Sequence, residues 1–139
     1  MKKNLAVAMA VTALMLASAV SAFAQHPWSM KVTVPFDFTV ENQRIPAGDY
    51  TVEKIVNGHL RMYTSDGKFS TSFLVIPKQG KTTAEVGRIS FHRYGTEYFL
   101  ASISMAGQNT GWEVLQGKLE SELAKKKTGA VETATLIGH

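Results

Sequence analysis

The chain has 139 residues, a formal net charge of +4 and no cysteine. The missing cysteines exclude disulfides, thiolate metal sites, a thiol nucleophile and the lipid-modified cysteine of bacterial lipoproteins. Charged residues make up 19% of the chain, below the roughly 25% of an average globular domain. The only dense basic cluster is 125–127, whereas a nucleic-acid-binding protein is expected to carry a basic stripe with aromatic residues between.

The start of the sequence has the three parts of a secretory signal peptide. Two lysines form a basic beginning, residues 5–20 are uncharged, and Ala22 and Ala24 form an Ala-x-Ala cleavage site. A membrane anchor is the alternative, but the apolar run is marginal for the ~20 residues that a spanning helix needs. We therefore expect residues 1–24 to be a cleaved signal peptide.

Residues 25–139 would then form a single domain. Lys2 and Lys3 leave with the signal peptide, so the domain keeps 13 basic and 11 acidic residues and a net charge of +2. A domain of about 115 residues can bury roughly two thirds of its unfolded surface, which is enough for a core without disulfides. We expect it to be periplasmic or secreted, with no transmembrane segment left after cleavage.

Residues 30–40 alternate apolar and polar side chains, which predicts a half-buried strand. Pro35 lies inside this run and has no N–H to donate, so the strand is expected at a sheet edge or bent there. Residues 41–48 read as a turn region that ends in Ile-Pro-Ala-Gly, and extended structure resumes at 50–52.

Two glycine turns predict a three-stranded meander. Asn57-Gly58 and Asp66-Gly67 each lie between extended runs, and both dipeptides favour tight hairpin turns. If each loop has two residues, Leu60 is placed opposite both Ile55 and Phe73 in the neighbouring strands. One face of the meander is then mainly apolar and the other polar.

Two further strands are expected over 85–93 and 97–105, joined at Tyr94-Gly95-Thr96. A turn at Tyr94-Gly95 would pair His92 with Glu97. A turn at Gly95-Thr96 would instead pair Arg93 with Tyr98. The sequence leaves both registers open.

The last part of the chain changes period. Apolar residues recur every three or four positions from Trp112, which predicts a helix over 113–127 that Gly117 weakens. We expect this helix to cover one end or face of the sheet, and residues 130–137 to form a closing strand. The predicted fold is therefore mainly β, an antiparallel β-sandwich or small barrel of about seven or eight strands with one short C-terminal helix.

The sequence contains no catalytic or metal-binding signature: Gly-x-Ser-x-Gly, Ser-x-x-Lys, His-Glu-x-x-His, calcium-loop and phosphate-loop patterns are all missing. The four histidines are too far apart in sequence for a local metal pair. A weak candidate polar cluster consists of His92, Arg93 and Glu97, for which a cross-strand polar pair is the ordinary interpretation. A hydrolase using His92 and a carboxylate is the third of our hypotheses.

The aromatic residues suggest a second kind of site. Phe69, Phe73 and Phe91 fall on or beside predicted strands and could line an apolar cavity. Core packing is the ordinary interpretation, because side chains fill the interior of a small barrel.

Two motifs in the first half of the domain resemble a known group of proteins. The motifs are Val34-Pro35-Phe36-Asp37-Phe38-Thr39-Val40 and Ile45-Pro46-Ala47-Gly48-Asp49-Tyr50-Thr51-Val52. They are similar to the Pro-Phe-x-Phe-x-Val and Leu/Ile-Pro-Ala-Gly-x-Tyr-x-Val pattern of small exported bacterial β-domain proteins. The resemblance covers most of the mature chain and implies a bacterial exported β domain, but it carries over no catalytic residue.

The sequence therefore predicts an exported, non-catalytic β-domain protein without a cofactor, acting as an envelope or extracellular structural or interaction module. The alternative is a periplasmic carrier that holds a small apolar ligand in a β-barrel or sandwich cavity. Expected partners are an envelope protein, a cell-wall component or a small apolar ligand, and not nucleic acid. Exposed strand edges could also pair two copies of the chain.

Overall fold

The computed structural model describes residues 28–56, 58–126 and 131–139, and within these ranges the chain is mainly β with one short helix. The strands are β1 Ser29–Val34, β2 Phe38–Val40, β3 Gln43–Ile45, β4 Gly48–Val56, β5 His59–Tyr63, β6 Ser70–Gln79, β7 Gly87–Tyr94, β8 Glu97–Ser104, β9 Thr110–Val114 and β10 Glu132–Gly138, and the helix is α2 Lys118–Lys126. This confirms the predicted fold class. The predicted count of seven or eight strands is wrong, because three short strands were not predicted as such. β2 lies in a segment predicted as part of a longer strand, β3 lies in a predicted turn region, and β9 overlaps the predicted start of the helix.

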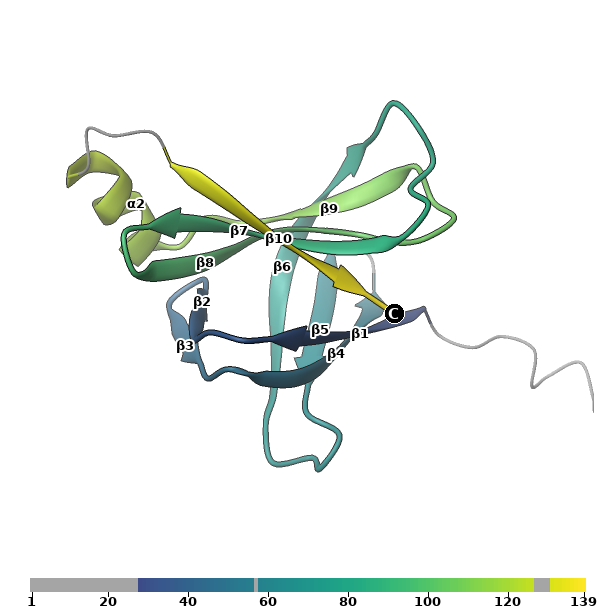
Figure 1. Cartoon of the computed structure of the whole chain (residues 1–139), viewed down its shortest axis with the longest axis horizontal. Helices are drawn as coiled ribbons and strands as arrows, with labels where there is room; N and C mark the ends of the chain where they lie inside the picture. The colour runs from purple at the N-terminus through teal and green to yellow at the C-terminus, as the bar shows by residue number, and fades with distance from the viewer. Residues whose placement is uncertain (1–27, 57, 127–130) are drawn as a thin grey trace, which may run out of the picture.

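The ten strands form one sheet that folds over on itself. Its order is β1-β4-β5-β6-β9-β8-β2-β3, and β7 pairs with both β8 and β10. Figure 1 shows β7 to β10 in one layer and β1 and β4 in the other, with the long strand β6 running between the layers. The first half of β6 pairs with β5 and the second half with β9. The result resembles a sandwich whose two layers share one strand.

The sheet is not closed, but the edge strand β1 and the edge strand β10 meet at one point. Lys31 in β1 and His139, directly after β10, exchange two backbone hydrogen bonds of 2.8 Å each. Beyond this contact β1 and β10 diverge, as Figure 1 shows near the end marked C. The alternative between a sandwich and a barrel is thus resolved as an open sheet with its terminal strands joined by a single residue pair.

The strand predicted over 30–40 is two strands. β1 ends at Val34, and β2 begins at Phe38 and pairs with β3 and, in parallel, with β8. Pro35 lies at the break, as its missing N–H requires. Phe36, between the two strands, keeps the predicted alternation: it is half-buried against the core, with its ring edge to face on Phe91 and stacked on Tyr98 at 3.8 Å.

The helix predicted over 113–127 begins later. Trp112 and Val114 are buried on β9, which pairs with β6 and β8, and α2 begins at Lys118. Trp112 and Leu115, three positions apart, fit a helix, whereas Trp112 and Val114, two positions apart, fit a strand, and pairing with β6 decides for the strand. A Cβ at Gly117 would come within 2.9 Å of Glu41 Cα, so glycine lets the chain pass closely before α2 begins. Residues 127 and 130, at the predicted ends of the helix and the closing strand, lie outside the described residues.

The first hairpin begins as predicted and then shifts. Val56 lies opposite His59, but a bulge at Ile55 places Lys54 opposite Leu60. The predicted pairing of Ile55 with Leu60 is therefore wrong.

The second hairpin has the predicted register, and the third has one of the two registers that the sequence left open. Leu60 lies opposite Phe73 as predicted from Asp66-Gly67. The turn at Gly95-Thr96 places Arg93 opposite Tyr98, which excludes the other register.

The core lies between the two layers. It contains the inward side chains of most strands, including Met30, Val32, Val34, Phe38, Ile45, Val52, Leu60, Met62, Phe73, Ile89, Phe91, Leu100 and Ile103. A large apolar interior of this kind is what holds together a small domain without disulfides. The helix α2 lies outside it, at the end of the layer formed by β7 and β8 (Figure 1).

Candidate functional site

A buried polar cluster joins α2 to the outer face of β7. Alternation along β7 turns His92 and Tyr94 to the same face, away from the core residue Phe91. The first turn of α2 contributes Glu120, the only charged side chain that is buried among the described residues, with 4% of its surface exposed. We call His92, Tyr94 and Glu120 the α2 cluster.

The start of α2 is fixed by the β2–β3 turn. The side-chain oxygen of Asn42 accepts a hydrogen bond from the backbone N–H of Leu119 at 3.3 Å, which satisfies one free donor of the first helical turn. Together with the close passage of Gly117 over Glu41, this contact sets the direction of the helix and so places Glu120 over β7.

Two donors compensate the buried carboxylate. The Nδ1–H of His92 donates to Glu120 Oε1 at 2.6 Å, and the hydroxyl of Tyr94 donates to the same oxygen at 3.1 Å. Burial, and then the neighbouring charge of Glu120, raise the pKa of Tyr94 above its ordinary value of 10.0. A buried carboxylate without such partners would cost several kcal/mol.

The structure does not bring the three predicted polar residues together. His92 lies opposite Phe99, and Glu97 lies opposite Tyr94 at the hairpin end. Arg93 is on the other face of β7, where its guanidinium lies 5.6 Å from the centroid of the Tyr98 ring. Glu120 occupies the place beside His92 that the alternative register gave to Glu97.

The α2 cluster orients the imidazole ring of His92, whose cross-strand neighbour on β10 is Thr133. The His92 side chain is 43% exposed, and its Nδ1 is held by a carboxylate, an arrangement that favours a base at the other ring nitrogen. None of the four hollows described below is lined by His92. The contacts of the cluster serve to hold α2 on the sheet.

The three predicted phenylalanines pack in or against the core. Phe91 makes edge-to-face contacts with Phe36 and Phe38, with centroids 5.0 and 5.3 Å apart, and Phe73 is buried. Phe69 makes an edge contact with Tyr50. These rings line none of the four hollows described below, in agreement with core packing as their ordinary interpretation.

The largest of the four hollows is apolar and lies where β1, β7 and β10 come together. Its volume is about 530 Å³. Most of its lining is apolar and includes the side chains of two methionines. The lining residues are Trp28, Ser29, Met30, Glu85, Val86, Gly87, Met105, Ala106, Ile137, Gly138 and His139. The Trp28 ring at its border packs edge to face on Trp112 at 4.6 Å.

A second hollow, of about 380 Å³, lies between α2 and the strands β2, β3 and β8. Phe99, Leu119 and Leu123 give it an apolar part, and side chains of both charges line the rest, namely Arg44, Glu97, Glu122 and Lys126. Because both positive and negative side chains line this hollow, its charge favours neither anionic nor cationic ligands.

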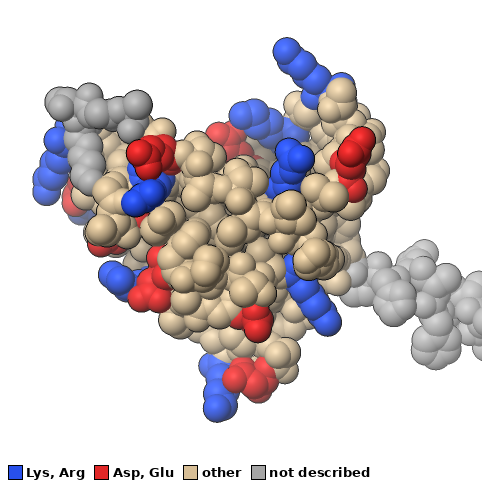
Figure 2. Space-filling view, viewed as in Figure 1, with Lys and Arg blue, Asp and Glu red and all other residues tan. Residues whose placement is uncertain are grey.

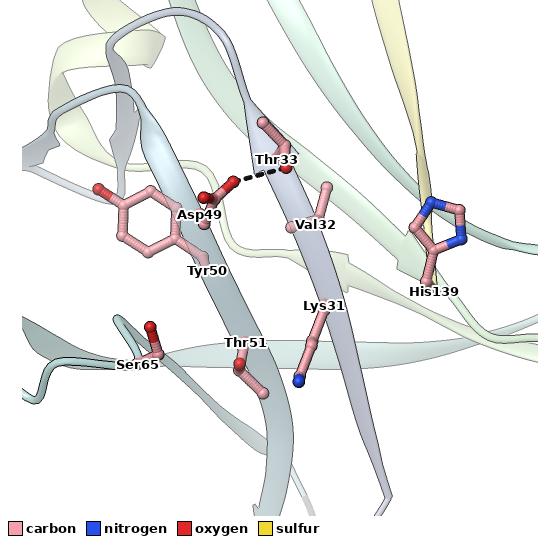
Figure 3. A pocket seen from close by; sticks show the side chains of 8 residues that line it. All are labelled: Lys31, Val32, Thr33, Asp49, Tyr50, Thr51, Ser65 and His139. Atoms are coloured by element: carbon pink, nitrogen blue, oxygen red, sulfur yellow. Dashed lines mark hydrogen bonds between the residues drawn. The ribbon is translucent and has the colours of Figure 1, made fainter.

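The remaining two hollows are smaller and are lined mainly by polar residues. One, of about 330 Å³, lies on the outer face of β1 and β4, where Thr33 Oγ1 donates to Asp49 at 2.6 Å (Figure 3). Figure 3 shows Lys31 and Thr51 beside each other on neighbouring strands and the Tyr50 ring directed away from Lys31. The other, of about 220 Å³, lies next to the loop at Gly80 and Asn109. Neither hollow encloses a ligand-sized apolar volume.

An exposed apolar row crosses the outer face of four neighbouring segments. Val56 in β4 and Leu74 in β6 lie on either side of His59, and the N–H of Leu115 donates to the carbonyl of Leu74. Ile76 lies two residues further along β6 on the same face. These four apolar side chains are between 39% and 56% exposed, and we call them the outer apolar row.

Metal and membrane sites are not evident in the described part of the chain. Within it, no three or more His, Cys, Asp or Glu side chains gather in a way that could hold a metal ion. No helix there is long and apolar enough to cross a membrane.

Comparison with protein-family models, with curated proteins and with solved structures finds no match to this chain. The functional assignment therefore depends on the geometry of the chain itself.

Proposed function

We propose that this chain is an exported, non-catalytic interaction module that presents an apolar patch of its sheet to a protein of the cell envelope or the extracellular space. The outer apolar row is the observation that carries the proposal. Export is supported by the three-part pattern of residues 1–24.

The outer apolar row suits a binding surface because Leu74 and Leu115 are direct neighbours, Ile76 follows on the same strand face, and His59 of β5 alone separates Val56 from Leu74. Scattered single apolar side chains are normal on a protein surface, whereas a contiguous patch marks an interaction site. Covering one large apolar side chain completely is worth about 1.5–3 kcal/mol, so several half-exposed ones can drive association. The ladders among β4, β5, β6 and β9 hold these side chains in place before a partner arrives, which lowers the entropy cost of binding.

The non-catalytic part of the proposal is supported by the α2 cluster. His92 is the best-oriented candidate base, but its carboxylate partner lies in a helix that the same contact anchors. A general base also needs a reacting group within hydrogen-bond reach, and the hollows are elsewhere.

Site-specific photo-crosslinking in the host tests the interaction surface. A photoreactive side chain is placed at Leu74 in the full-length chain, with Lys68, an exposed residue of the neighbouring hairpin loop, as the matched control position. We expect one adduct of defined mass from position 74 and not from position 68, and we expect Leu115→Lys to weaken it. Equal adducts from both positions, or none from position 74, would refute the proposal.

The apolar hollow beside Trp28 supports a second candidate function, the carriage of a small apolar ligand. A volume of about 530 Å³ lies within the range of small-molecule sites, and Met30, Met105 and Ile137 give it an apolar lining. Native mass spectrometry of the chain isolated gently from its host's envelope fraction decides between the two. A reproducible extra mass of a few hundred daltons, lost on Met105→Lys, would favour the carrier, and a bare chain would count against it.

A further inference from the structure

The outer edge of β10 carries unpaired backbone groups. β7 pairs with one edge of β10, and His139, one residue beyond, directs its N–H and C=O to β1 on the other side. In an antiparallel ladder, alternate residues turn their backbone groups to the same edge. Thr133, Thr135 and Ile137 therefore direct their N–H and C=O groups away from β7, at the edge where β10 diverges from β1.

This edge lacks the features with which proteins block strand pairing. Edge strands are usually short or carry proline or inward lysine. β3 has three residues and is followed by Pro46, and β1 carries Lys31 and is followed by Pro35. Residues 133–138 of β10 contain neither charge nor proline. The centre of the face over which β10 runs is also largely free of charged side chains, which lie around its border (Figure 2).

Two exposed apolar side chains, one directly before β10 and one in it, make the edge complementary to itself. Val131 is 43% exposed and Ile137 is 59% exposed, and both share the outer face with Thr133 and Thr135. An antiparallel second copy centred on Ala134 would place Val131 opposite Ile137 and Thr133 opposite Thr135. Both exposed apolar residues would then gain a partner, and no like charges would meet.

We propose that two copies of this chain form a dimer by antiparallel pairing of β10 with β10, about a two-fold axis at Ala134. The two sheets become one continuous sheet in the order β8-β7-β10-β10-β7-β8. Each copy offers the same patch, as two-fold symmetry requires, and the outward groups of Thr133 and Thr135 gain backbone partners. Since the contact is one strand wide, we expect a weak, concentration-dependent dimer.

The dimer is independent of the proposed function. The outer apolar row lies on β4, β6 and the residue after β9, whereas the dimer uses β10. Failure of the crosslinking at Leu74 would therefore contradict the proposed function and not the dimer. A monomeric chain would contradict the dimer and not the proposed function.

The test compares two double variants by analytical ultracentrifugation over a concentration series. In Thr133→Lys/Thr135→Lys, lysines face lysines across the two-fold axis. In Thr133→Lys/Thr135→Glu, each lysine faces a glutamate. Ser90→Lys is the control, because Ser90 lies opposite Thr135 on β7, a strand paired on both edges. All proteins are produced from the full-length gene, and circular dichroism verifies that each variant is folded.

We expect the unmodified chain, the Ser90→Lys control and the Lys/Glu variant to dimerise with similar affinity, and the Lys/Lys variant to lose roughly tenfold or more. The amide of Thr135 should also exchange with solvent more slowly as the concentration of the unmodified chain rises. A chain that stays monomeric into the high micromolar range would overturn the proposal. So would a dimer that the Lys/Lys variant leaves unchanged, or one that both double variants abolish equally.

Discussion

Met30 and Gly138 fit together as knob and hole: the thioether of Met30 occupies the space that a Cβ on Gly138 would need. Gly87, paired with Gly138 across β7 and β10, borders the same space, since a Cβ there would come within 2.6 Å of Met30 Sδ. Met30 is 2% exposed and lines the apolar hollow, so a Cβ at position 138 would displace its thioether from this packed position toward the hollow. The contact fastens β1 to the opposite layer beside the Lys31–His139 pair.

Replacing Gly138 by alanine should therefore destabilise the fold. Overfilling a packed site costs about 1–3 kcal/mol, and we expect a loss of that size in the free energy of unfolding, measured by urea denaturation. Gly48→Ala is the matched control, because its Cβ would make only ordinary contacts of 3.6 Å or more with the Tyr50 ring. Equal stability of the two variants would contradict the knob-and-hole contact.

Removing the carboxylate of Glu120 should loosen α2. In Glu120→Ala the hydroxyl of Tyr94 and the ring of His92 lose their shared acceptor, and we expect a loss of about 1–3 kcal/mol in the free energy of unfolding. Hydrogen exchange should show the α2 amides opening faster. Glu122→Ala, an exposed change in the same helix, should stay within about 0.5 kcal/mol of the unmodified chain. A stable Glu120→Ala variant with a protected helix would show that the α2 cluster does not anchor α2.

The raised pKa of Tyr94 predicts a loss of stability in alkali. The folded state holds the phenolic proton more tightly than the unfolded state, whose pKa is near 10.0. The stabilisation is fully present below pH 10 and is lost as the pH rises through the folded value. We expect the free energy of unfolding of the unmodified chain to fall above pH 10 more steeply than that of Tyr94→Phe. Parallel curves in urea titrations at several pH values would contradict this expectation.

The loop between β5 and β6 should lower the pKa of Asp66. Thr64 Oγ1 donates to the carboxylate at 2.6 Å and the N–H of Lys68 at 3.0 Å, and both bonds favour the charged form, so the pKa lies below its usual 3.8. Thr64→Val removes the first donor and should move the pKa of Asp66 upward in an NMR titration of its carboxyl carbon. Ser65→Ala, which removes an exposed hydroxyl from the same loop, should leave it unchanged.

The hairpins were predictable because their signals are local. Asp66-Gly67 determined the pairing of Leu60 with Phe73 by counting alone. The same counting failed at the first hairpin, where the bulge at Ile55 depends on how the strand fits against its neighbours and leaves no mark in the sequence. Strand β9 was missed for a related reason, because Trp112 has a helical spacing to Leu115 and a strand spacing to Val114, and only pairing with β6 selects the strand.

The candidate site was less predictable than the fold. His92 could be singled out, but its acceptor Glu120 is 28 positions away in sequence on a helix whose orientation depends on contacts with Asn42 and Glu41. The outer apolar row comes from β4, β6 and the residue after β9, and it emerges only once the registers of these strands are known. Surfaces assembled from distant segments have no local sequence signature.

The pairing of Lys31 with His139 also sets an order of events in folding. The two residues are more than a hundred positions apart, so this contact closes one of the longest loops in the molecule. Chains rich in such distant contacts fold slowly. During synthesis, the edge of β7 stays open until β10 has been made, and for that interval the unfinished sheet is most exposed to pairing with the wrong strand.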